Sequence, residues 1–297
     1  MAIVLVATAA IFTWYMRAHP EHITQLRQLQ PRWLGLMLVA NISGMAALTG
    51  LYQILVRMLG VRLPTVENML LTIYSSIANF FGPLQSGPGV RAAYLKAKHH
   101  IPLRKYVFVT LLAYGVYAVL SVFCLAVGTR PWWQTLGAVM LVTLVSAAVI
   151  RLVARRRGHR PGLLRLQTPL LVGLVVCTAA QIACIALRYY CALRAGGAEV
   201  SLGQVLSYTG AANFALFVSV TPDAIGIREA FLYLAQNIHG VPTADIVSAS
   251  LVDRAVYVLC LGMLFVGALV LHAKERVLPT SAAPPSKKPK KRPEDSA

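Results

Sequence analysis

The sequence is poor in charged residues, and acidic residues are the scarcest of them. Only 13% of its 297 residues are charged, and only 10 are Asp or Glu. A soluble domain carries about 25% charged residues. The chain therefore has too little charge to cover a water-exposed surface, which excludes an ordinary soluble domain.

The sequence also lacks the residue groups that several kinds of site require. It has no acidic cluster of the D-x-D type and no His inside its long apolar runs, which argues against a metal-dependent enzyme. The Gly-Pro-Gly-Val-Arg run at 87–91 lacks the Lys-Ser/Thr and the preceding strand of a nucleotide-binding loop. The five cysteines all lie within apolar runs, which is typical of packed helix faces rather than disulfides or metal sites. We expect no metal and no cofactor.

What the sequence does contain is long apolar runs, and 57% of its residues are apolar. Most of these runs approach the roughly 20 residues that a helix needs to cross about 30 Å of hydrocarbon. They predict an all-α polytopic membrane protein with about six full spans, at 2–16, 33–57, 106–128, 132–150, 168–190 and 246–272. The net charge of +18 does not indicate nucleic-acid binding, because the basic residues lie in loops beside the spans.

One pattern occurs twice in the chain. Residues 78–95 and 212–232 both contain A-N-F, then a gap broken by Gly and Pro, then G-[VI]-R-x-A-[YF]-L. Such an internal repeat predicts two copies of one unit, at about 33–128 and 168–272. The membrane domain would then cover 1–272, and a disordered basic tail would follow at 273–297.

Each copy is predicted to carry a broken or re-entrant helical hairpin. In the first, a semi-apolar segment at 66–82 is followed by a Gly/Pro-rich break at 82–89 and a basic helix at 90–99, which is too charged to cross lipid. The second hairpin covers 201–240. Irregular backbone at membrane depth is tolerated only where it lines a protein cavity.

The arginine-rich loop at 151–165 sets the predicted orientation. The positive-inside bias places this loop in the cytoplasm, together with the C-terminal tail. An odd number of crossings then separates the starts of the two units, so they would form an inverted repeat. Inverted repeats with paired broken helices indicate a transporter binding site.

The two hairpins share a chemical feature that suits an anion. In Gly89-Val90-Arg91 and Gly226-Ile227-Arg228, a Gly is expected to release the backbone and a helix then begins beside an Arg. Helix N-termini attract anions, and the planar guanidinium suits phosphate. The two ends could bracket one phosphate. The alternative for Arg91 is that it extends to the cytoplasmic interface.

Asp253 and Arg254 lie about eight residues into the last span, which is about 12 Å inside at ~1.5 Å per residue. Adjacent helical residues point about 100° apart, so the two cannot pair with each other. One of them needs a partner from elsewhere, such as Glu229 or a ligand phosphate. The alternatives are that Asp253 and Arg254 only hold helices together, and that Glu229 only compensates the helix dipole.

Three further polar residues have two interpretations each. Asn79 and Asn213 could satisfy broken backbone or touch a ligand. Arg188, near the predicted end of its span, is interpreted as extending to the interface. The substrate-binding residues predicted from the sequence are Arg228, Glu229, Arg254, Asp253, Arg91, Asn213, Asn79, Gly226 and Gly89.

The motif P-D-A-I-G-I-R-E-A at 222–230, with D-R-x-x-Y beginning at Asp253, resembles the transmembrane region of lysylphosphatidylglycerol synthases and related flippase-like proteins. The resemblance covers about 30–272, including the weaker copy at 83–94. It implies movement of a lipid between leaflets. Synthases of the family carry a soluble acyltransferase-like domain after the membrane part, whereas about 25 residues follow the last span here, so aminoacyl transfer is not expected.

Together with this resemblance, the patterns predict a lipid translocator, multi-pass in the bacterial inner membrane, and the resemblance implies an anionic phospholipid or a polyprenyl-phosphate-linked lipid as its substrate. Two alternatives stay open. One is a membrane-embedded lipid-modifying transferase that uses an acidic residue as its base. The other is a non-transporting scaffold for enzymes of lipid or glycan synthesis, which are also the expected protein partners.

Overall fold

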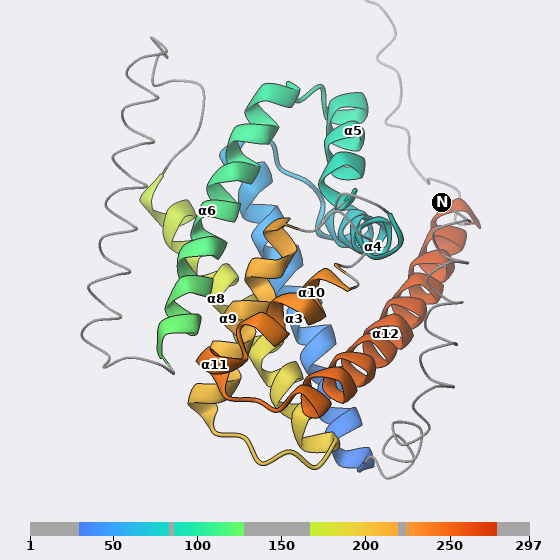
Figure 1. Ribbon diagram of the computed structural model, residues 1–297. Coiled ribbons are helices and arrows are strands. Elements are labelled where there is room, and N and C mark those ends of the chain that lie inside the picture. The colour runs from blue at the N-terminus through green and yellow to red at the C-terminus, as the bar shows by residue number, and fades with distance from the viewer. Residues whose placement is uncertain (1–29, 83–85, 128–166, 219–223, 225, 278–297) are drawn as a thin grey trace, which may run out of the picture.

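The computed structural model describes residues 30–82, 86–127, 167–218, 224 and 226–277, and this part of the chain is helical (Figure 1). Short turns join most of the helices in sequence. The described helices are α3 (Pro31–Met58), α4 (Thr65–Phe81), α5 (Gly87–His99), α6 (Leu103–Val127), α8 (Thr168–Ala195), α9 (Leu202–Val218), α10 (Ile227–Leu234), α11 (Gln236–His239) and α12 (Thr243–Val277).

Four described helices are long and apolar enough to cross a membrane. They are α3, α6, α8 and the part of α12 from Thr243 to Leu271. They match the spans predicted at 33–57, 106–128, 168–190 and 246–272. The other two predicted spans, at 2–16 and 132–150, lie outside the described residues.

The predicted break between the two legs of the first hairpin is confirmed, but it ends earlier than expected. Helix α5 begins at Gly87, so Gly89 lies inside the first turn and does not release the backbone. The physical reason is close packing at Gly87, where a Cβ atom would meet the carbonyl oxygen of Ser75 at 2.5 Å. Glycine is needed there because α5 starts against the backbone of α4.

The two legs of this hairpin are also joined by a polar cluster at their far ends. Glu67 Oε1 accepts hydrogen bonds from the Tyr94 hydroxyl (2.8 Å) and from His99 (2.7 Å), and Lys98 lies 3.2 Å away. Burial raises the pKa of Glu67, but these partners outweigh it and hold that pKa below its usual value. The carboxylate therefore ties the start of α4 to the end of α5.

The helices of the two predicted units follow one another in the same order. Helices α3 and α8 each have 28 residues with Pro in the first turn, and α4 and α9 each have 17 residues. The first helix of each series is followed by a glycine with positive φ, Gly60 at 83° and Gly197 at 88°. That the two units have inverted orientations stays a prediction.

Helices α3 and α8 pack along each other through small residues. A Cβ atom at Gly44 would lie 3.4 Å from Cys184 Cβ, and one at Gly50 would lie 3.3 Å from Cys177 Sγ. Gly44 and Gly50 thus face two cysteines of α8, which are free thiols. This contact brings the first helices of the two series close together and positions the cavity beside them.

Candidate functional site

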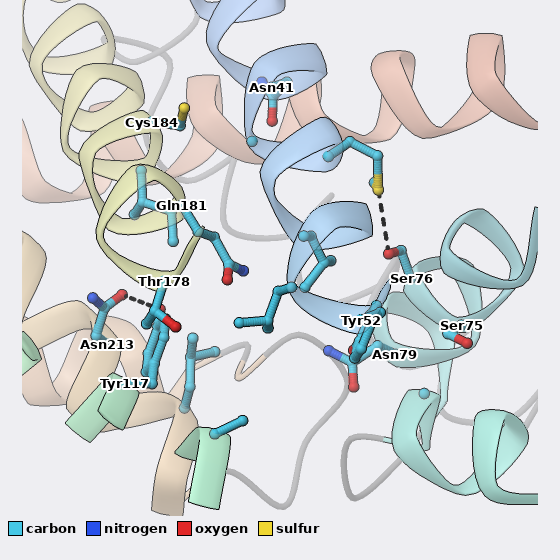
Figure 2. Close-up of a pocket in the computed structure, with 18 of the residues that line it drawn as sticks. Asn41, Tyr52, Ser75, Ser76, Asn79, Tyr117, Thr178, Gln181, Cys184 and Asn213 are labelled. Atoms are coloured by element: carbon cyan, nitrogen blue, oxygen red, sulfur yellow. Dashed lines mark hydrogen bonds between the residues drawn. The ribbon is translucent and has the colours of Figure 1, made fainter. Parts of the chain in front are cut away.

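A cavity of about 250 Å³ lies among the long helices and the two broken hairpins (Figure 2). Residues of α3, α4, α6, α8, α9, α10 and α12 line it, together with the start of α5. Its charged lining comes from Arg188, Arg228, Asp253 and Arg254. Three of these four residues were predicted as site residues from the sequence.

A buried ion pair in the cavity joins Arg188 on α8 to Asp253 on α12. Two nitrogens of the Arg188 guanidinium donate to the Asp253 carboxylate at 2.8–2.9 Å, and the Asp253 side chain is 1% exposed. The interpretation that Arg188 extends to the interface is wrong. Helix α8 continues to Ala195, so Arg188 lies two turns before its end and its side chain turns inward.

Arg228 enters the same group of charges from the second hairpin. Its guanidinium lies 3.6 Å from Asp253 Oδ2 and donates hydrogen bonds to the Ser250 hydroxyl (3.2 Å) and the Tyr189 hydroxyl (3.4 Å). The sequence places it there because Gly226, with φ of 80°, turns the chain into α10 directly before it. As predicted, a glycine releases the backbone and the helix then begins beside an arginine.

Glu229 has two roles at this helix start. Its Oε2 accepts the backbone N–H of Gly226 at 2.8 Å, which caps α10. Its Oε1 lies 2.8 Å from Arg254 Nη2, 3.8 Å from Arg228 Nε, and accepts a hydrogen bond from Ser250. Dipole compensation and pairing with Arg254, which the sequence offered as separate interpretations, therefore occur together.

Arg91, the counterpart of Arg228 in the first unit, is placed differently. It is 1% exposed and does not extend to the interface. Its guanidinium stacks 3.8 Å from the centre of the Tyr52 ring and donates hydrogen bonds to Asn68 and Thr72. Arg91 is not among the residues that line the cavity. The expectation that Arg91 and Arg228 bracket one phosphate is thus not met by this conformation.

The two predicted asparagines both line the cavity but are used differently (Figure 2). The Asn213 amide accepts a hydrogen bond from the Tyr117 hydroxyl (2.8 Å) and donates to Ser121 (3.2 Å), so it joins α9 to α6. Asn79 lies in the last turn of α4, and its Oδ1 has no hydrogen-bond partner within the described part of the chain. The Asn213 side chain therefore joins two helices, whereas the Asn79 Oδ1 atom can still accept a hydrogen bond at the cavity.

His239 at the end of α11 fixes the turn that closes the second hairpin. It donates from Nε2 to the carbonyl oxygen of Leu232 (2.8 Å), and Nδ1 accepts the backbone N–H of Val241 (3.0 Å). This arrangement needs the neutral ring. Burial lowers the pKa of His239, and the hydrogen bond to Leu232 opposes only part of that shift.

We therefore expect the protein to lose stability as the pH falls below about 6.5, the ordinary pKa of histidine. Below this pH, His239 takes up a proton more readily in the unfolded chain than in the folded protein. The unfolded state therefore binds more protons, and the free energy of unfolding falls as the pH falls. Melting temperatures measured between pH 5 and 8 in detergent would show this slope, and His239→Asn should flatten it. The exposed His100 provides the control: His100→Asn should leave the slope unchanged, and an unchanged slope in His239→Asn would contradict the assignment.

Sequence reasoning missed the contributions of Arg188 and of the tyrosines around the arginines. Tyr189 lies beneath Arg228 at 5.9 Å, and the Tyr257 ring lies 4.9 Å from the Arg188 guanidinium. A sequence signal for Tyr189 was present, because Tyr189 and Tyr52 occupy equivalent positions in the two units, and the Tyr52 ring centre lies 3.8 Å from the Arg91 guanidinium.

The helices and the charged cavity define a multi-pass helical membrane protein. The chain belongs to the family described as the lysylphosphatidylglycerol synthase TM region, whose model matches residues 1–265. The resemblance stated from the motif at 222–230 and from Asp253-Arg254 is confirmed. Membership of this family links the protein to lipid metabolism or transport. No curated protein matches the sequence.

Proposed function

We propose that this protein translocates a lipid with an anionic phosphate headgroup, either a phospholipid or a polyprenyl-phosphate-linked lipid, between the leaflets of the bacterial inner membrane. One observation carries the proposal. Three arginines, Arg188, Arg228 and Arg254, meet two carboxylates, Asp253 and Glu229, at a cavity between candidate membrane spans. This leaves one positive charge in excess, which a phosphodiester would balance.

The depth of these charges supports a functional role. Asp253 lies ten residues from the start of α12, about 15 Å along the helix, and Arg188 lies seven residues from the end of α8, about 10 Å along it. Charged side chains at such depth are costly, and they commonly mark the pathway of a substrate or an ion. A cluster that served only to join helices could use neutral polar groups.

Phosphate binding would proceed by exchange of partners. Glu229 pairs with Arg254, and Asp253 pairs with Arg188. A phosphate entering the cavity offers the guanidinium groups the same bidentate geometry as a carboxylate. The acids thus keep the arginines positioned and compensated, and release them when the lipid arrives.

The two Tyr–Arg contacts support alternating exposure of the two hairpins. Tyr52–Arg91 and Tyr189–Arg228 occupy equivalent positions, but Arg228 faces the cavity and Arg91 is enclosed behind it. In the proposed cycle, inverted units exchange these two arrangements, so that the cavity opens to one leaflet and then to the other. The C-terminal tail lies in the cytoplasm in this scheme, where enzymes of lipid or glycan synthesis are candidate partners.

The test is a headgroup flux assay in proteoliposomes made with a labelled anionic phospholipid. Arg228→Ala should reduce flux at least tenfold, because a charge-assisted hydrogen bond is worth about 1.5–3 kcal/mol and each 1.4 kcal/mol is a factor of ten. The variant is expected to fold, since Asp253 and Glu229 keep Arg188 and Arg254 as partners.

The matched control is Arg57→Ala, which removes an exposed arginine in the last turn of α3. Its flux should equal that of the unaltered protein. Equal flux in folded Arg228→Ala would contradict the proposal. Conversion of the labelled lipid to a new product by the purified protein would instead favour the lipid-modifying transferase.

A further inference from the structure

The turn that joins α5 to α6 has a counterpart in the turn that joins α11 to α12. Residues 96–105 read K-A-K-H-H-I-P-L-R-K, and residues 236–245 read Q-N-I-H-G-V-P-T-A-D, with a His and a Pro at the same positions. Each turn contains one residue in the left-handed region, His100 with φ of 52° and Gly240 with φ of 67°. The buried parts of the two turns are also built alike, because each is held by three apolar residues at equivalent positions: Leu95, Ile101 and Tyr106 in the first, and Ala235, Val241 and Ile246 in the second.

The side chains outside these anchors differ in charge between the two turns. The first turn has four Lys or Arg residues, whereas the second has none and carries Asp245. Lys98 pairs with Glu67 at 3.2 Å, and Glu67 is the only acid of the sequence between residues 22 and 198. Within the part of the chain that the structure describes, no ion pair is formed by the other three cations, which are Lys96, Arg104 and Lys105. Because the second turn is built in the same way without such residues, the cations are not needed to form the turn.

The first turn lies where the outer face of α6 begins. Leu103, Val107 and Leu111 are 51%, 45% and 62% exposed, and their spacing of four residues places them along one side of the helix. Helix α6 is long and apolar enough to cross a membrane, so this stripe is the side of the span that faces lipid. Figure 1 shows the turn at the upper end of α6, beside α5. Arg104 and Lys105 directly follow the first residue of the stripe, so the cations lie at the level where lipid chains meet headgroups.

We infer that the turn at 96–105, through Lys96, Arg104 and Lys105, binds the phosphate groups of anionic lipids at the surface of the adjoining leaflet. Lys and Arg residues next to a membrane span are attracted to anionic headgroups. A lipid surface fits this turn better than an acidic protein does, because the cations continue directly into the lipid-facing stripe of α6. None of the three cations lines the cavity, so this surface is separate from the site of the proposed function and does not depend on it. Zwitterionic lipids, which have no net charge, bind the turn less tightly.

The test measures lipid affinity by native mass spectrometry of the full-length protein in neutral detergent, titrated separately with dioleoyl phosphatidylglycerol and dioleoyl phosphatidylcholine. The test variant combines Lys96→Gln with Arg104→Ala, which introduces the residues found at the equivalent positions of the second turn, so the turn should still form. Phosphatidylglycerol should bind this variant at least about fivefold more weakly, which is the contribution of one Lys or Arg near an anionic surface. Binding of phosphatidylcholine should not change. Unchanged binding of phosphatidylglycerol by the folded variant would overturn the inference.

The matched control combines Arg32→Gln with Arg194→Gln. It removes the same charge at the start of α3 and the end of α8, where Trp33 and Tyr190 are in contact, whereas the turn packs against the other end of α3. This control should keep the full affinity for phosphatidylglycerol, and an equal loss would mean that only the net charge of the protein matters. The same comparison in an Arg228→Ala background separates the turn from the cavity. The loss caused by the turn variant should be as large there, and its disappearance would place the lipid in the cavity and contradict the inference.

Salt provides a readout that does not depend on the folding of any variant. Raising the salt concentration from ~0.1 M to ~1 M shortens the screening length from about 10 Å to about 3 Å. The affinity of the unaltered protein for phosphatidylglycerol should then fall at least about fivefold, because the cations of the turn are exposed or half-exposed. An affinity that does not respond to salt would show that the turn does not bind this lipid. Binding of a polyglutamate peptide that phosphatidylglycerol does not displace would overturn the inference in favour of an acidic protein partner.

Discussion

Asp253→Ala is expected to destabilise the protein by about 3–5 kcal/mol, the usual consequence of removing one partner of a buried ion pair. Asp253 is 1% exposed and accepts three hydrogen bonds from two nitrogens of Arg188, with Arg228 at 3.6 Å. Without the carboxylate, Arg188 loses the buried acid that it pairs with, whereas Arg228 still has Glu229 at 3.8 Å. Thermal unfolding of the purified protein in detergent measures the loss.

Two further variants separate the ion pair from other effects. Arg188→Met combined with Asp253→Leu removes both charges together and should recover most of the lost stability, because replacing a whole buried pair by apolar groups is often neutral. Asp245→Ala, in the first turn of the same helix, should change the stability by less than about 1 kcal/mol. A melting temperature of Asp253→Ala equal to that of the unaltered protein would show that the pair is not formed.

Arg254→Gln and Glu229→Gln are expected to change lipid affinity in opposite directions. If a phosphate replaces Glu229 as the partner of Arg254, then loss of Arg254 should weaken binding at least tenfold, through a lost charge-assisted hydrogen bond of about 1.5–3 kcal/mol. Loss of the Glu229 charge removes the competitor, so Glu229→Gln should bind the lipid more tightly. Its flux should nevertheless fall, because nothing then displaces the lipid from Arg254.

Affinity from calorimetric titration and flux from proteoliposomes together test this exchange. Glutamine keeps an amide oxygen for the Gly226 N–H, so the capping of α10 should survive the Glu229→Gln change. Arg57→Gln serves as the control for loss of an arginine outside the cavity. Weaker binding by both Arg254→Gln and Glu229→Gln would mean that the carboxylate contributes to the site directly, and the exchange would be wrong.

Much of the fold could be predicted from the sequence, because membrane spans and helix breaks depend on local composition. The apolar runs located four described spans, and the Gly/Pro clusters located the break before α5. Arg228, Glu229 and Arg254 could be brought together by reasoning about depth and helix geometry, since a charge far inside a span requires a partner.

The rest depends on packing that local composition does not encode. Helix α8 extends five residues beyond its predicted end. Arg188 therefore lies inside the helix rather than near its end, and its side chain pairs with Asp253 instead of extending to the interface. Arg91 has the same local pattern as Arg228, but it lacks a following acid and finds Asn68, Thr72 and Tyr52 instead.

The double use of Glu229 sets how far the residues of the proposed site would have to move on binding a ligand. One carboxylate oxygen stays tied to the start of α10 through the Gly226 N–H, while the other is available to Arg254. In the proposed exchange, the acid therefore cannot follow its partner when the arginine turns to a ligand, and it stays in place to recapture the side chain afterwards. Loading and unloading would then require rotation of one long side chain about its own bonds, with the helix start held fixed throughout.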